Sequence, residues 1–327
     1  MRTLVTGGNG FLGQYIVEQL VAEKSFVRSL SRRPSNALKA LGVETVLGDL
    51  RDPGIAQRAC QDVDVVFHVA GVAGIWGPWK YFHGINTRGT EQLVASAIQA
   101  GVQKFVYTSS PSVTFNGTDQ EFIDESEPYP SRWLCHYQHS KALAEQHVLQ
   151  AHNGNSFLTC ALRPHLIWGP RDQHLIPRLL DRARSGRLRQ VGDGQNLVDM
   201  IYVENAAQAH LLAAKALTPS SAVGGNPYFI SQDQPVNCWK WINQLLALAD
   251  IPPIQKSISK QAAWRLGGVM EFVYTLLGRT NEPPMTRFLA AQLATSHYFD
   301  TSRARKDFGF HPKISTEEGM RRLSQSW

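Results

Sequence analysis

Tyr137 and Lys141 are the residues of this sequence whose types and spacing most directly suggest chemistry. Side chains four positions apart lie on one face of a helix. A phenol, with an ordinary pKa of about 10, is a poor proton donor or acceptor at neutral pH. An ammonium about 4 Å away, at an effective dielectric of about 20, would favour the phenolate by roughly 4 kcal/mol and bring its pKa near 7. The pair therefore predicts a general acid/base, although the same spacing is common on amphipathic helix surfaces.

A hydroxyl that could assist this pair follows the β-branched, aromatic segment Phe105–Thr108. Ser109 and Ser110 stand directly after it, before Pro111. A hydroxyl at a strand end can donate a hydrogen bond to a substrate carbonyl and to the alkoxide that develops from it. We favour Ser110 for this role, with Ser109 as the alternative, although serines before a proline are also common in plain turns.

A glycine-rich loop, Thr6–Gly13, follows the first apolar segment and opens the first helical pattern. Its glycines fit both common dinucleotide-binding spacings. One allows a tight turn, another a close approach of the backbone to a pyrophosphate, and the last close packing of helix on strand. The pyrophosphate would lie at the helix N-terminus, where free N–H groups and the helix dipole favour an anion. The residues expected there are Gly7, Gly10, Phe11, Leu12 and Gly13.

The end of the next predicted strand bears on the choice of cofactor. An NAD-binding chain of this kind usually carries an acid about 20 residues after the glycine loop, where it binds the ribose. Here Phe26–Leu30 is followed by Ser31, Arg32 and Arg33, with no carboxylate. An arginine can form charge-assisted bonds to a 2′-phosphate, and a serine leaves space for it. We therefore predict NADP, although two arginines in an exposed loop are also common.

Two further strand ends support a dinucleotide site. Asp49 and Leu50 follow the third predicted strand, where a carboxylate could accept a hydrogen bond from the adenine amino group. Ala70 and Gly71 end the fourth, and such small residues would let the cofactor backbone pass. Each observation alone is weak, since aspartate is a frequent turn residue.

Short β-branched segments alternate with helical patterns along the first half of the chain. The predicted strands are Thr3–Thr6, Phe26–Leu30, Val43–Leu47, Val63–Val69, Phe105–Thr108 and Phe157–Leu162. The predicted helices are Phe11–Ala22, Gly54–Cys60, Thr87–Ala100 and Tyr137–Ala151. Several strands are apolar on both faces, which is typical of a parallel sheet covered by helices. The predicted fold class is therefore α/β, with a doubly wound parallel Rossmann sheet.

The pattern changes near Pro164, where proline, arginine and tryptophan become more frequent. We expect a smaller, mostly helical substrate lobe over the carboxyl edge of the sheet. The predicted domains are a Rossmann domain of residues 1–163, with a return of about 199–231, and a lobe of 164–198 and 232–327. Later elements are expected at Met200–Val203, Glu204–Leu217, Tyr228–Ile230, Gln261–Leu277 and Met285–Ala294. The aromatic residues that could line a pocket in the lobe, or equally form its core, are Trp239, Trp241, Trp264, Phe272 and Tyr274.

The bulk composition fits a globular protein. The chain has 327 residues, 43% of them hydrophobic and 18% charged, which argues against disorder. Its formal charge of +6 favours anionic ligands, but no basic run with interleaved aromatics points to nucleic acid. The four cysteines are widely spaced, so neither a disulfide framework nor a metal site is expected. The N-terminus leaves no room for a signal peptide and no segment suffices for a membrane span, so we expect cytoplasmic residence.

Further segments carry a resemblance to a known family. They are Val106–Val113, Ala161–His165, Trp168–Asp172 and Gly192–Asp199. With the glycine loop and the Ser/Tyr/Lys set, the chain resembles the extended short-chain dehydrogenase/reductases of the 3β-hydroxysteroid dehydrogenase group over essentially its full length. It resembles in particular the bacterial reductases of 2-alkyl-3-oxoalkanoic acids. The segments that match these reductases are Ile167–Pro170, Asn205–His210 and Pro284–Leu289.

The resemblance implies an NADP(H)-dependent oxidoreductase that interconverts a secondary alcohol and a ketone. It implies that Tyr137 donates the proton, that Lys141 is its partner and a cofactor contact, and that Ser110 orients the carbonyl. Pro164 and Leu166 would offer backbone groups to the nicotinamide carboxamide. The full set of expected cofactor contacts is Gly7, Gly10, Phe11, Leu12, Gly13, Arg32, Arg33, Asp49, Leu50, Ala70, Gly71, Thr108, Tyr137, Lys141, Pro164 and Leu166.

The expected reaction is reduction of a 2-alkyl-3-oxoalkanoic acid to a 2-alkyl-3-hydroxyalkanoic acid in long-chain olefin biosynthesis. The alternative is oxidation of a sterol by a 3β-hydroxysteroid dehydrogenase, but Ser31 stands where NAD-using steroid relatives carry an acid. A non-catalytic NADP-binding sensor is a third hypothesis, which the intact Ser110, Tyr137 and Lys141 disfavour. We expect a small hydrophobic substrate as partner, without nucleic acid, membrane span or metal. We also expect a homodimer, which could assemble with other pathway enzymes.

Overall fold

Seven parallel strands form the main sheet of the computed structural model, which describes residues 1–327. Their order is β12-β7-β5-β4-β1-β2-β3. They are β1 (Arg2–Thr6), β2 (Phe26–Ser31), β3 (Glu44–Leu47), β4 (Val65–His68), β5 (Lys104–Thr108), β7 (Leu158–Pro164) and β12 (Pro227–Ile230). The chain runs outward from β1 to β3 and then returns to the other side of β1 with β4. Because the order reverses there, the carboxyl ends of β1 and β4 open the crevice where such sheets bind ligands.

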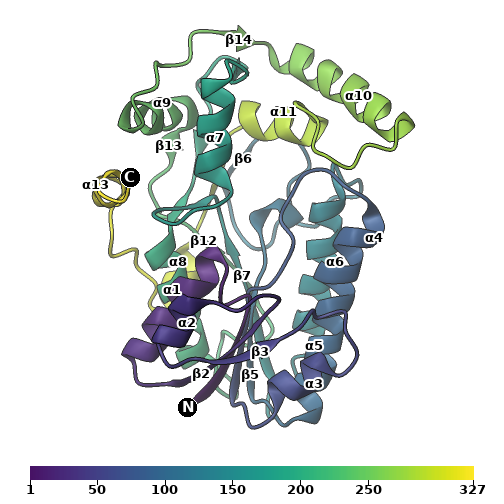
Figure 1. Ribbon diagram of the computed structural model, residues 1–327, viewed down its shortest axis with the longest axis vertical. Coiled ribbons are helices and arrows are strands. Elements are labelled where there is room, and N and C mark those ends of the chain that lie inside the picture. Colours follow the sequence, from purple (N-terminus) through teal and green to yellow (C-terminus); the bar gives the residue numbers. More distant parts are fainter.

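Helices cover both faces of this sheet (Figure 1). The helices of one face are α1 (Phe11–Ala22), α2 (Asn36–Ala40) and α8 (Val203–Ala216), and those of the other are α3 (Ile55–Cys60), α5 (Gly89–Gln99) and α6 (His136–Gln150). Successive strand residues point to opposite faces. Leu4 and Val5 of β1 are both fully buried, each in the core on a different face. This double burial explains why the strands are apolar throughout.

The predicted fold class is confirmed. The predicted strands and helices of the first half all form, with ends that differ by at most two residues. The sequence did not predict α4 (Trp79–Phe82) and the π-helical turn η1 (His83–Arg88), which run continuously into α5. A π-turn changes the helical repeat, so the apolar positions of this segment do not follow a 3.6-residue period.

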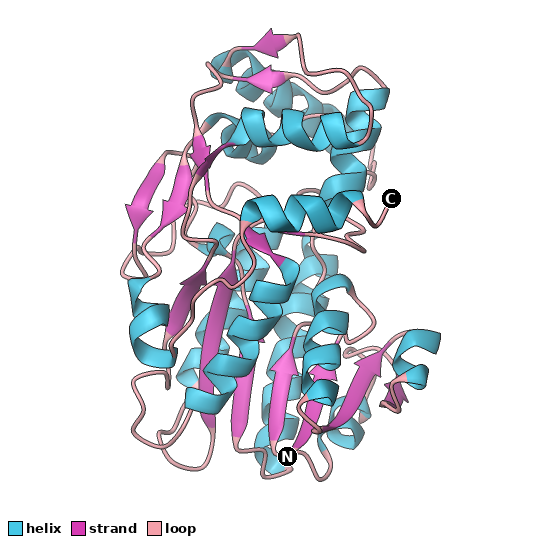
Figure 2. Ribbon diagram, turned by 90° about the vertical axis from the view of Figure 1, so that its left-hand side faces the viewer, coloured by secondary structure: helices cyan, strands magenta, loops and turns pink.

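The other end of the molecule holds further helices and several short strands (Figure 2). The helices are α7 (Leu175–Arg184), α9 (Cys238–Leu248), α10 (Lys260–Leu276) and α11 (Arg287–Ala294). A four-stranded sheet has the order β13 (Val236–Asn237), β10 (Leu197–Val198), β15 (His297–Phe299) and β6 (Gln120–Ile123). Two strand pairs are β8 (Ile167–Trp168) with β11 (Ile201–Tyr202), and β9 (Gln190–Val191) with β14 (Ser257–Ile258).

The expectation of a mostly helical lobe omitted this second sheet. Its strands have two to four residues, which is too short for an alternating pattern to be recognised. One of them, β6, comes from residues 120–123, within the segment expected to form the Rossmann domain. Conversely, β12 lies in the predicted return segment and pairs with β7 in the main sheet.

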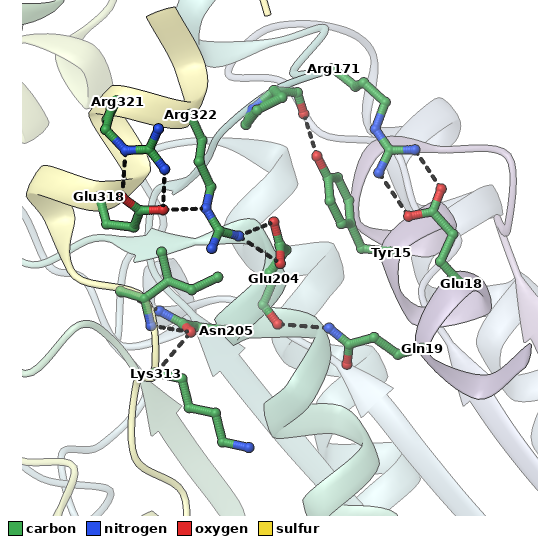
Figure 3. Close-up of polar contacts among 12 residues, drawn as sticks. Tyr15, Glu18, Gln19, Arg171, Glu204, Asn205, Lys313, Glu318, Arg321 and Arg322 are labelled. Atoms are coloured by element: carbon green, nitrogen blue, oxygen red, sulfur yellow. Dashed lines mark hydrogen bonds and ion pairs between the residues drawn. The ribbon is translucent and has the colours of Figure 1, made fainter. Parts of the chain in front are cut away.

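Polar contacts join the second half of the chain to the helices of the main sheet (Figure 3). Arg171 forms a two-point ion pair with Glu18 of α1, at 2.6 and 2.9 Å, and its guanidinium lies 3.9 Å from the ring centroid of Tyr15. The Tyr15 hydroxyl donates a hydrogen bond to the carbonyl of Pro170. The C-terminal helices, α12 (Ser302–Phe308) and α13 (Thr316–Ser324), follow, and α13 is ion-paired to the start of α8. These contacts fix the loop after β8 beside the crevice.

Candidate active site

One cleft at the carboxyl ends of the main strands contains every residue that the sequence predicted for the cofactor and for catalysis. Its volume is about 890 Å³. The predicted residues that line it are Gly7, Gly10, Phe11, Leu12, Gly13, Arg32, Arg33, Asp49, Leu50, Ala70, Gly71, Thr108, Ser110, Tyr137, Lys141, Pro164 and Leu166. Ser109, the alternative to Ser110, lines it as well. Segments far apart in the sequence thus meet at the topological switch point.

The glycine loop depends on contacts that a side chain would block. Gly7 has a φ of +70°, and a Cβ there would lie 3.0 Å from the Cα of Ala70. A Cβ on Gly13 would lie only 2.1 Å from the carbonyl oxygen of Gly7. Gly10 precedes α1, and no side chain caps that end of the helix. The first N–H groups of α1 are therefore left free, as a bound pyrophosphate requires.

The end of β2 presents cations and no acid. Arg32 and Arg33 are exposed, line the cleft and take part in no ion pair. The buried Ser31 hydroxyl is hydrogen-bonded to that of Ser29 at 3.0 Å. Asn9 of the glycine loop donates a hydrogen bond to the carbonyl of Arg33, which ties the two loops together. Two free guanidinium groups beside the glycine loop fit the phosphate group of a phosphorylated ribose.

Asp49 lies in the cleft as expected, but its carboxylate already has a partner. Arg51 donates to both of its oxygens, at 2.9 and 2.8 Å. This pairing lowers the pKa of Asp49, so the group is ionised at neutral pH. Oδ1 also accepts a hydrogen bond from the backbone N–H of Arg51, at 2.9 Å, so the free lone pair is on Oδ2. The predicted contact with the adenine amino group is therefore compatible with the ion pair.

Ser110 and Tyr137 lie together at the junction of β5 and α6. The Ser110 hydroxyl is 2.8 Å from that of Ser112 and accepts a hydrogen bond from the Ser112 N–H. Burial raises the pKa of Tyr137, and the adjacent Ser110 hydroxyl opposes this effect. Ser109, by contrast, is 5% exposed and donates its N–H to Leu162 of the neighbouring strand. The geometry favours Ser110 over Ser109 as the group that acts on a substrate oxygen.

Lys141 is buried beside these residues, and its ammonium is hydrogen-bonded to a backbone carbonyl and not to the phenol. Its ammonium donates to the carbonyl of Thr108 at 2.6 Å and lies 4.2 Å from the centroid of the Tyr107 ring. Burial lowers the pKa of Lys141 from 10.5 to about 7, with Glu145 opposing. The expectation that Lys141 would bring the pKa of Tyr137 near 7 is wrong for this structure. Here burial dominates both groups, and it raises the pKa of the phenol.

A buried ion pair that the sequence analysis missed lies one turn after Lys141 on α6. Glu145 is fully buried and Arg163 of β7 is 2% exposed, and they are joined by two hydrogen bonds of 2.6 and 3.0 Å. Tyr129 donates a third hydrogen bond to the same carboxylate, at 2.7 Å. The available signal was the four-residue spacing of Lys141 and Glu145 in the predicted helix. Its arginine partner comes from a distant strand and carried no local signal.

The loop after β4 is a second feature that the sequence did not reveal. Asn86 of η1 accepts a hydrogen bond from the N–H of Val72 and donates to its carbonyl, at 2.7 and 3.1 Å. It also donates to the Ser140 hydroxyl of α6. This buried amide fixes the loop against the helix that carries Tyr137. Other lining residues that the sequence did not predict as site residues are Val72, Ala73, Tyr81, Ile85, Ile167, Asp172, Gln173, His174 and Leu175.

An apolar cluster adjoins the start of α6. Phe115 and Phe288 pack edge to face in it, with ring centroids 6.0 Å apart. The partly buried residues packed against them are Ile75, Leu134, Cys135 and Trp264. Of the aromatic residues proposed for a pocket, only Trp264 belongs to this cluster. Trp239 and Trp241 lie in the core of the second half, and Phe272 is exposed.

Comparisons with known proteins bear on the family of this chain. The model of the 3-beta hydroxysteroid dehydrogenase/isomerase family matches residues 4–258. The 2-alkyl-3-oxoalkanoate reductase of Shewanella oneidensis is 46% identical over 98% of this chain and 85% of its own. That of Stenotrophomonas maltophilia is 46% identical over 100% of this chain and 99% of its own. The human sterol-4-alpha-carboxylate 3-dehydrogenase, decarboxylating, is 34% identical over 100% of this chain and 88% of its own.

Among solved structures, a dTDP-glucose 4,6-dehydratase double mutant from Streptomyces venezuelae, with NAD and DAU bound, superimposes with a TM-score of 0.74. It covers 100% of this chain and 96% of its own, at 22% identity. At that identity the likeness establishes the fold alone. The family expected from the motifs and the family found by comparison are the same.

Proposed function

Because the chain belongs to the 3-beta hydroxysteroid dehydrogenase/isomerase family, we propose that it is an NADP(H)-dependent enzyme that reduces 2-alkyl-3-oxoalkanoic acids to 2-alkyl-3-hydroxyalkanoic acids. The observation that carries the proposal is the gathering of Ser110, Tyr137 and Lys141 in the cleft that also holds the glycine loop. Two relatives named for this reaction, each 46% identical, support the substrate class. A role in long-chain olefin biosynthesis is part of the proposal.

The site residues divide into cofactor holders and proton-handling groups. The free N–H groups at the start of α1 would hold the pyrophosphate, Arg32 and Arg33 the 2′-phosphate, and the turn at Pro164 and Leu166 the carboxamide. When bound, NADPH supplies the hydride that reduces the carbonyl carbon. Two observations support the fit of NADPH to this cleft. The glycine loop has no room for a Cβ at Gly13, and no acid follows β2.

The catalytic roles follow from where the polar atoms lie. The Ser110 hydroxyl donates a hydrogen bond to the substrate oxygen and orients the carbonyl. The Tyr137 hydroxyl gives its proton to that oxygen as negative charge develops there. The Lys141 ammonium, held by the Thr108 carbonyl, supplies positive charge in favour of the resulting phenolate and holds the ribose hydroxyls. The apolar cluster of Phe115 and Phe288 would receive the alkyl chains.

Replacement of the phenol tests the assigned acid. Tyr137→Phe is expected to abolish turnover and to leave the Kd of NADPH nearly unchanged, because only the proton donor is lost. Fluorescence titration with NADPH measures binding, and initial rates measure turnover. Substantial turnover in this variant would show that another group is the acid.

Cofactor choice is tested separately. A charge-assisted phosphate contact contributes about 1.5–3 kcal/mol, so kcat/KM with NADPH should exceed that with NADH by roughly tenfold or more. Arg32→Ala should remove most of this preference, whereas Arg58→Ala, an exposed and unpaired arginine on α3, should leave it intact. Equal kcat/KM for the two cofactors in the unaltered protein would refute the NADP assignment.

The substrate class is tested with a chain-length series. Formation of NADPH is followed with 2-alkyl-3-hydroxyalkanoic acids of graded length beside 3β-hydroxysteroids. Each buried CH₂ contributes about 0.8 kcal/mol, so each one removed should lower kcat/KM roughly fourfold. The alternative function is sterol oxidation, which the human sterol dehydrogenase relative supports at 34% identity. Faster turnover of the steroid, or indifference to alkyl length, would favour that alternative.

The proposal includes the domain division predicted from the sequence. Residues 1–163, with 199–231, would bind the dinucleotide, and 164–198 with 232–327 would select the substrate. The place of β12 in the main sheet and of α10 and α11 beside the apolar cluster supports this division. We also propose a cytoplasmic homodimer, able to assemble with other pathway enzymes. Sedimentation equilibrium of the full chain would report its mass, and a monomer would refute the dimer.

A further inference from the structure

Helix α10 exposes an apolar face to the outside of the molecule. Its outward residues recur every three or four positions, which places them on one side of the helix. They are Leu266, Val269, Phe272, Val273, Leu276 and, directly after the helix, Leu277. Phe272 and Leu276 are 69% and 73% exposed. No part of the described chain covers these side chains, and in Figure 1 the helix lies at the upper margin of the molecule, away from the N-terminus.

The opposite face of α10 fixes this orientation. Gly267 packs so closely on the residue before α11 that a Cβ would lie 2.6 Å from the backbone of Thr286. The buried carboxylate of Glu271 accepts hydrogen bonds from the backbone and side chain of Arg287, both at 2.7 Å. A rotation of the helix would break these contacts. The apolar face is therefore held outward by the packing of the inner face.

The charged side chains in and next to α10 that form no ion pair are all positive. The exposed cations in and next to the helix that take part in no ion pair are Lys256, Lys260, Arg265 and Arg279. Both acids between positions 256 and 287 are taken up by arginines, Glu271 by Arg287 and Glu282 by Arg178 and Arg182. An apolar stripe with a cationic border is therefore presented to the surroundings.

We propose that this face of α10 binds the surface of an anionic lipid bilayer. Apolar side chains of such a helix enter the boundary of the acyl region, while lysine and arginine contact lipid phosphates. No helix of the chain has the length and apolar character to cross a bilayer. Because Gly267 and Glu271 hold the inner face of α10 on the protein, the helix would lie along the bilayer surface. A second copy of this chain fits the face poorly, because a two-fold contact would set its unpaired cations against one another. This inference does not depend on the proposed substrate.

The proposed lipid-facing helix is tied to the cleft. Trp76, in the loop after β4, donates its indole N–H to the carbonyl of Arg279 at 3.1 Å. Its ring also packs edge to face on Tyr274, with centroids 6.2 Å apart. The same loop contributes Val72 and Ala73 to the cleft. A bilayer bound at α10 would therefore adjoin the loop that borders the site.

Vesicle flotation of the full chain tests the proposal. We expect the protein to float with vesicles of phosphatidylglycerol and phosphatidylcholine, and not with vesicles of phosphatidylcholine alone. Phe272→Ser with Leu276→Ser should reduce binding by at least about tenfold, because the inserted groups are lost. Arg265→Gln with Arg279→Gln should weaken it by roughly fivefold per cation, and added salt should weaken it further.

Matched controls distinguish binding through this face of α10 from nonspecific binding of the protein to vesicles. Phe122→Ser removes a phenylalanine that is 65% exposed on β6, and Lys24→Gln with Arg58→Gln makes the same change in net charge elsewhere. Both controls should bind like the unaltered protein, and an unchanged Tm should show that every variant is folded. Absence of flotation with anionic vesicles, equal flotation with neutral ones, or equal loss in the controls would overturn the proposal. A smaller sedimentation mass in the Phe272/Leu276 variant, without any vesicle binding, would assign the face to a second copy instead.

Discussion

Replacing Lys141 by methionine is expected to stabilise the protein while it removes activity. The lysine is 5% exposed, and its ammonium has one hydrogen-bond acceptor, the carbonyl of Thr108. Methionine has a similar length and no charge to bury. In the proposed reaction, Lys141 serves the phenol and the ribose. In the folded protein without cofactor, the same side chain lowers the free energy of unfolding. Sites that are built for chemistry commonly trade stability for function in this way.

The size of this cost follows from the pKa of Lys141, which burial lowers from 10.5 to about 7. At about 1.4 kcal/mol per pKa unit, the charged form is disfavoured by roughly 5 kcal/mol below pH 7. The variant leaves the Thr108 carbonyl without its donor, which costs about 1–3 kcal/mol. The net gain for Lys141→Met is then about 2–4 kcal/mol at pH 6.

The pH dependence gives the sharper test. A lysine whose pKa is lowered by folding binds its proton more weakly in the folded state, so the unaltered protein becomes more stable as pH rises from 7 towards 10.5. The variant lacks this gain, and by pH 9 its advantage should have fallen by roughly 3 kcal/mol and be nearly cancelled. Urea unfolding of the cofactor-free proteins from pH 6 to pH 9 measures the difference. A variant less stable at pH 6, or an advantage independent of pH, would refute the reasoning.

Three further changes have calculable outcomes. Arg163→Met should cost about 3–5 kcal/mol of unfolding free energy because it leaves the buried Glu145 carboxylate unpaired, and Arg163→Met with Glu145→Leu should recover most of it; a double variant no more stable in urea than the single one would contradict this. Gly13→Ala should raise the Kd of NADPH at least about tenfold in a fluorescence titration, since its Cβ would lie 2.1 Å from the Gly7 carbonyl oxygen; unchanged affinity would count against the proposed pyrophosphate site. Burial raises the pKa of Asp199 to about 6, so folding favours its protonated form, and Asp199→Asn should raise the Tm at pH 8 and do so progressively less as pH falls from 6 towards 4. A pH-independent effect on Tm would exclude that carboxyl as the cause.

The dinucleotide half could be predicted because its signals are local. The glycines at 7, 10 and 13 sit where a strand meets a helix, and the structure shows which backbone atoms exclude a Cβ there. The main strands are buried on both faces, so each appears in the sequence as an apolar segment in which polar and apolar residues do not alternate. Each such segment is bounded by a helical pattern. Their ends therefore agree with the structure to within two residues. The arginines at the end of β2 could be placed in the cleft for the same reason, because they directly follow a recognisable strand.

The second sheet could not be predicted because its strands pair between segments that are far apart in the sequence. β15 pairs with β6 across more than half of the chain, and β10 joins it through a short contact. Neither strand is long enough to show a period. The pKa of Tyr137 was misjudged for a related reason. The four-residue spacing correctly placed Lys141 on the same face of α6 as Tyr137. Its ammonium, however, is hydrogen-bonded to the carbonyl of Thr108 at the end of β5, a contact between distant segments that the spacing does not reveal.

This division of signals also explains why the cofactor is easier to infer than the substrate. Most of the proposed cofactor contacts lie in loops that directly follow single strands, so each can be recognised in one short segment. The apolar cluster beside Tyr137 is assembled from the loop after β4, from Phe115 after β5, and from α10 and α11. No one of these segments carries a substrate motif. If this cluster receives the alkyl chains as proposed, repacking Trp264 or Phe288 would change the substrate while the glycine loop and the Ser/Tyr/Lys set stay the same. Under the proposed function, the choice between an alkyl acid and a sterol would depend on the shape of this cluster.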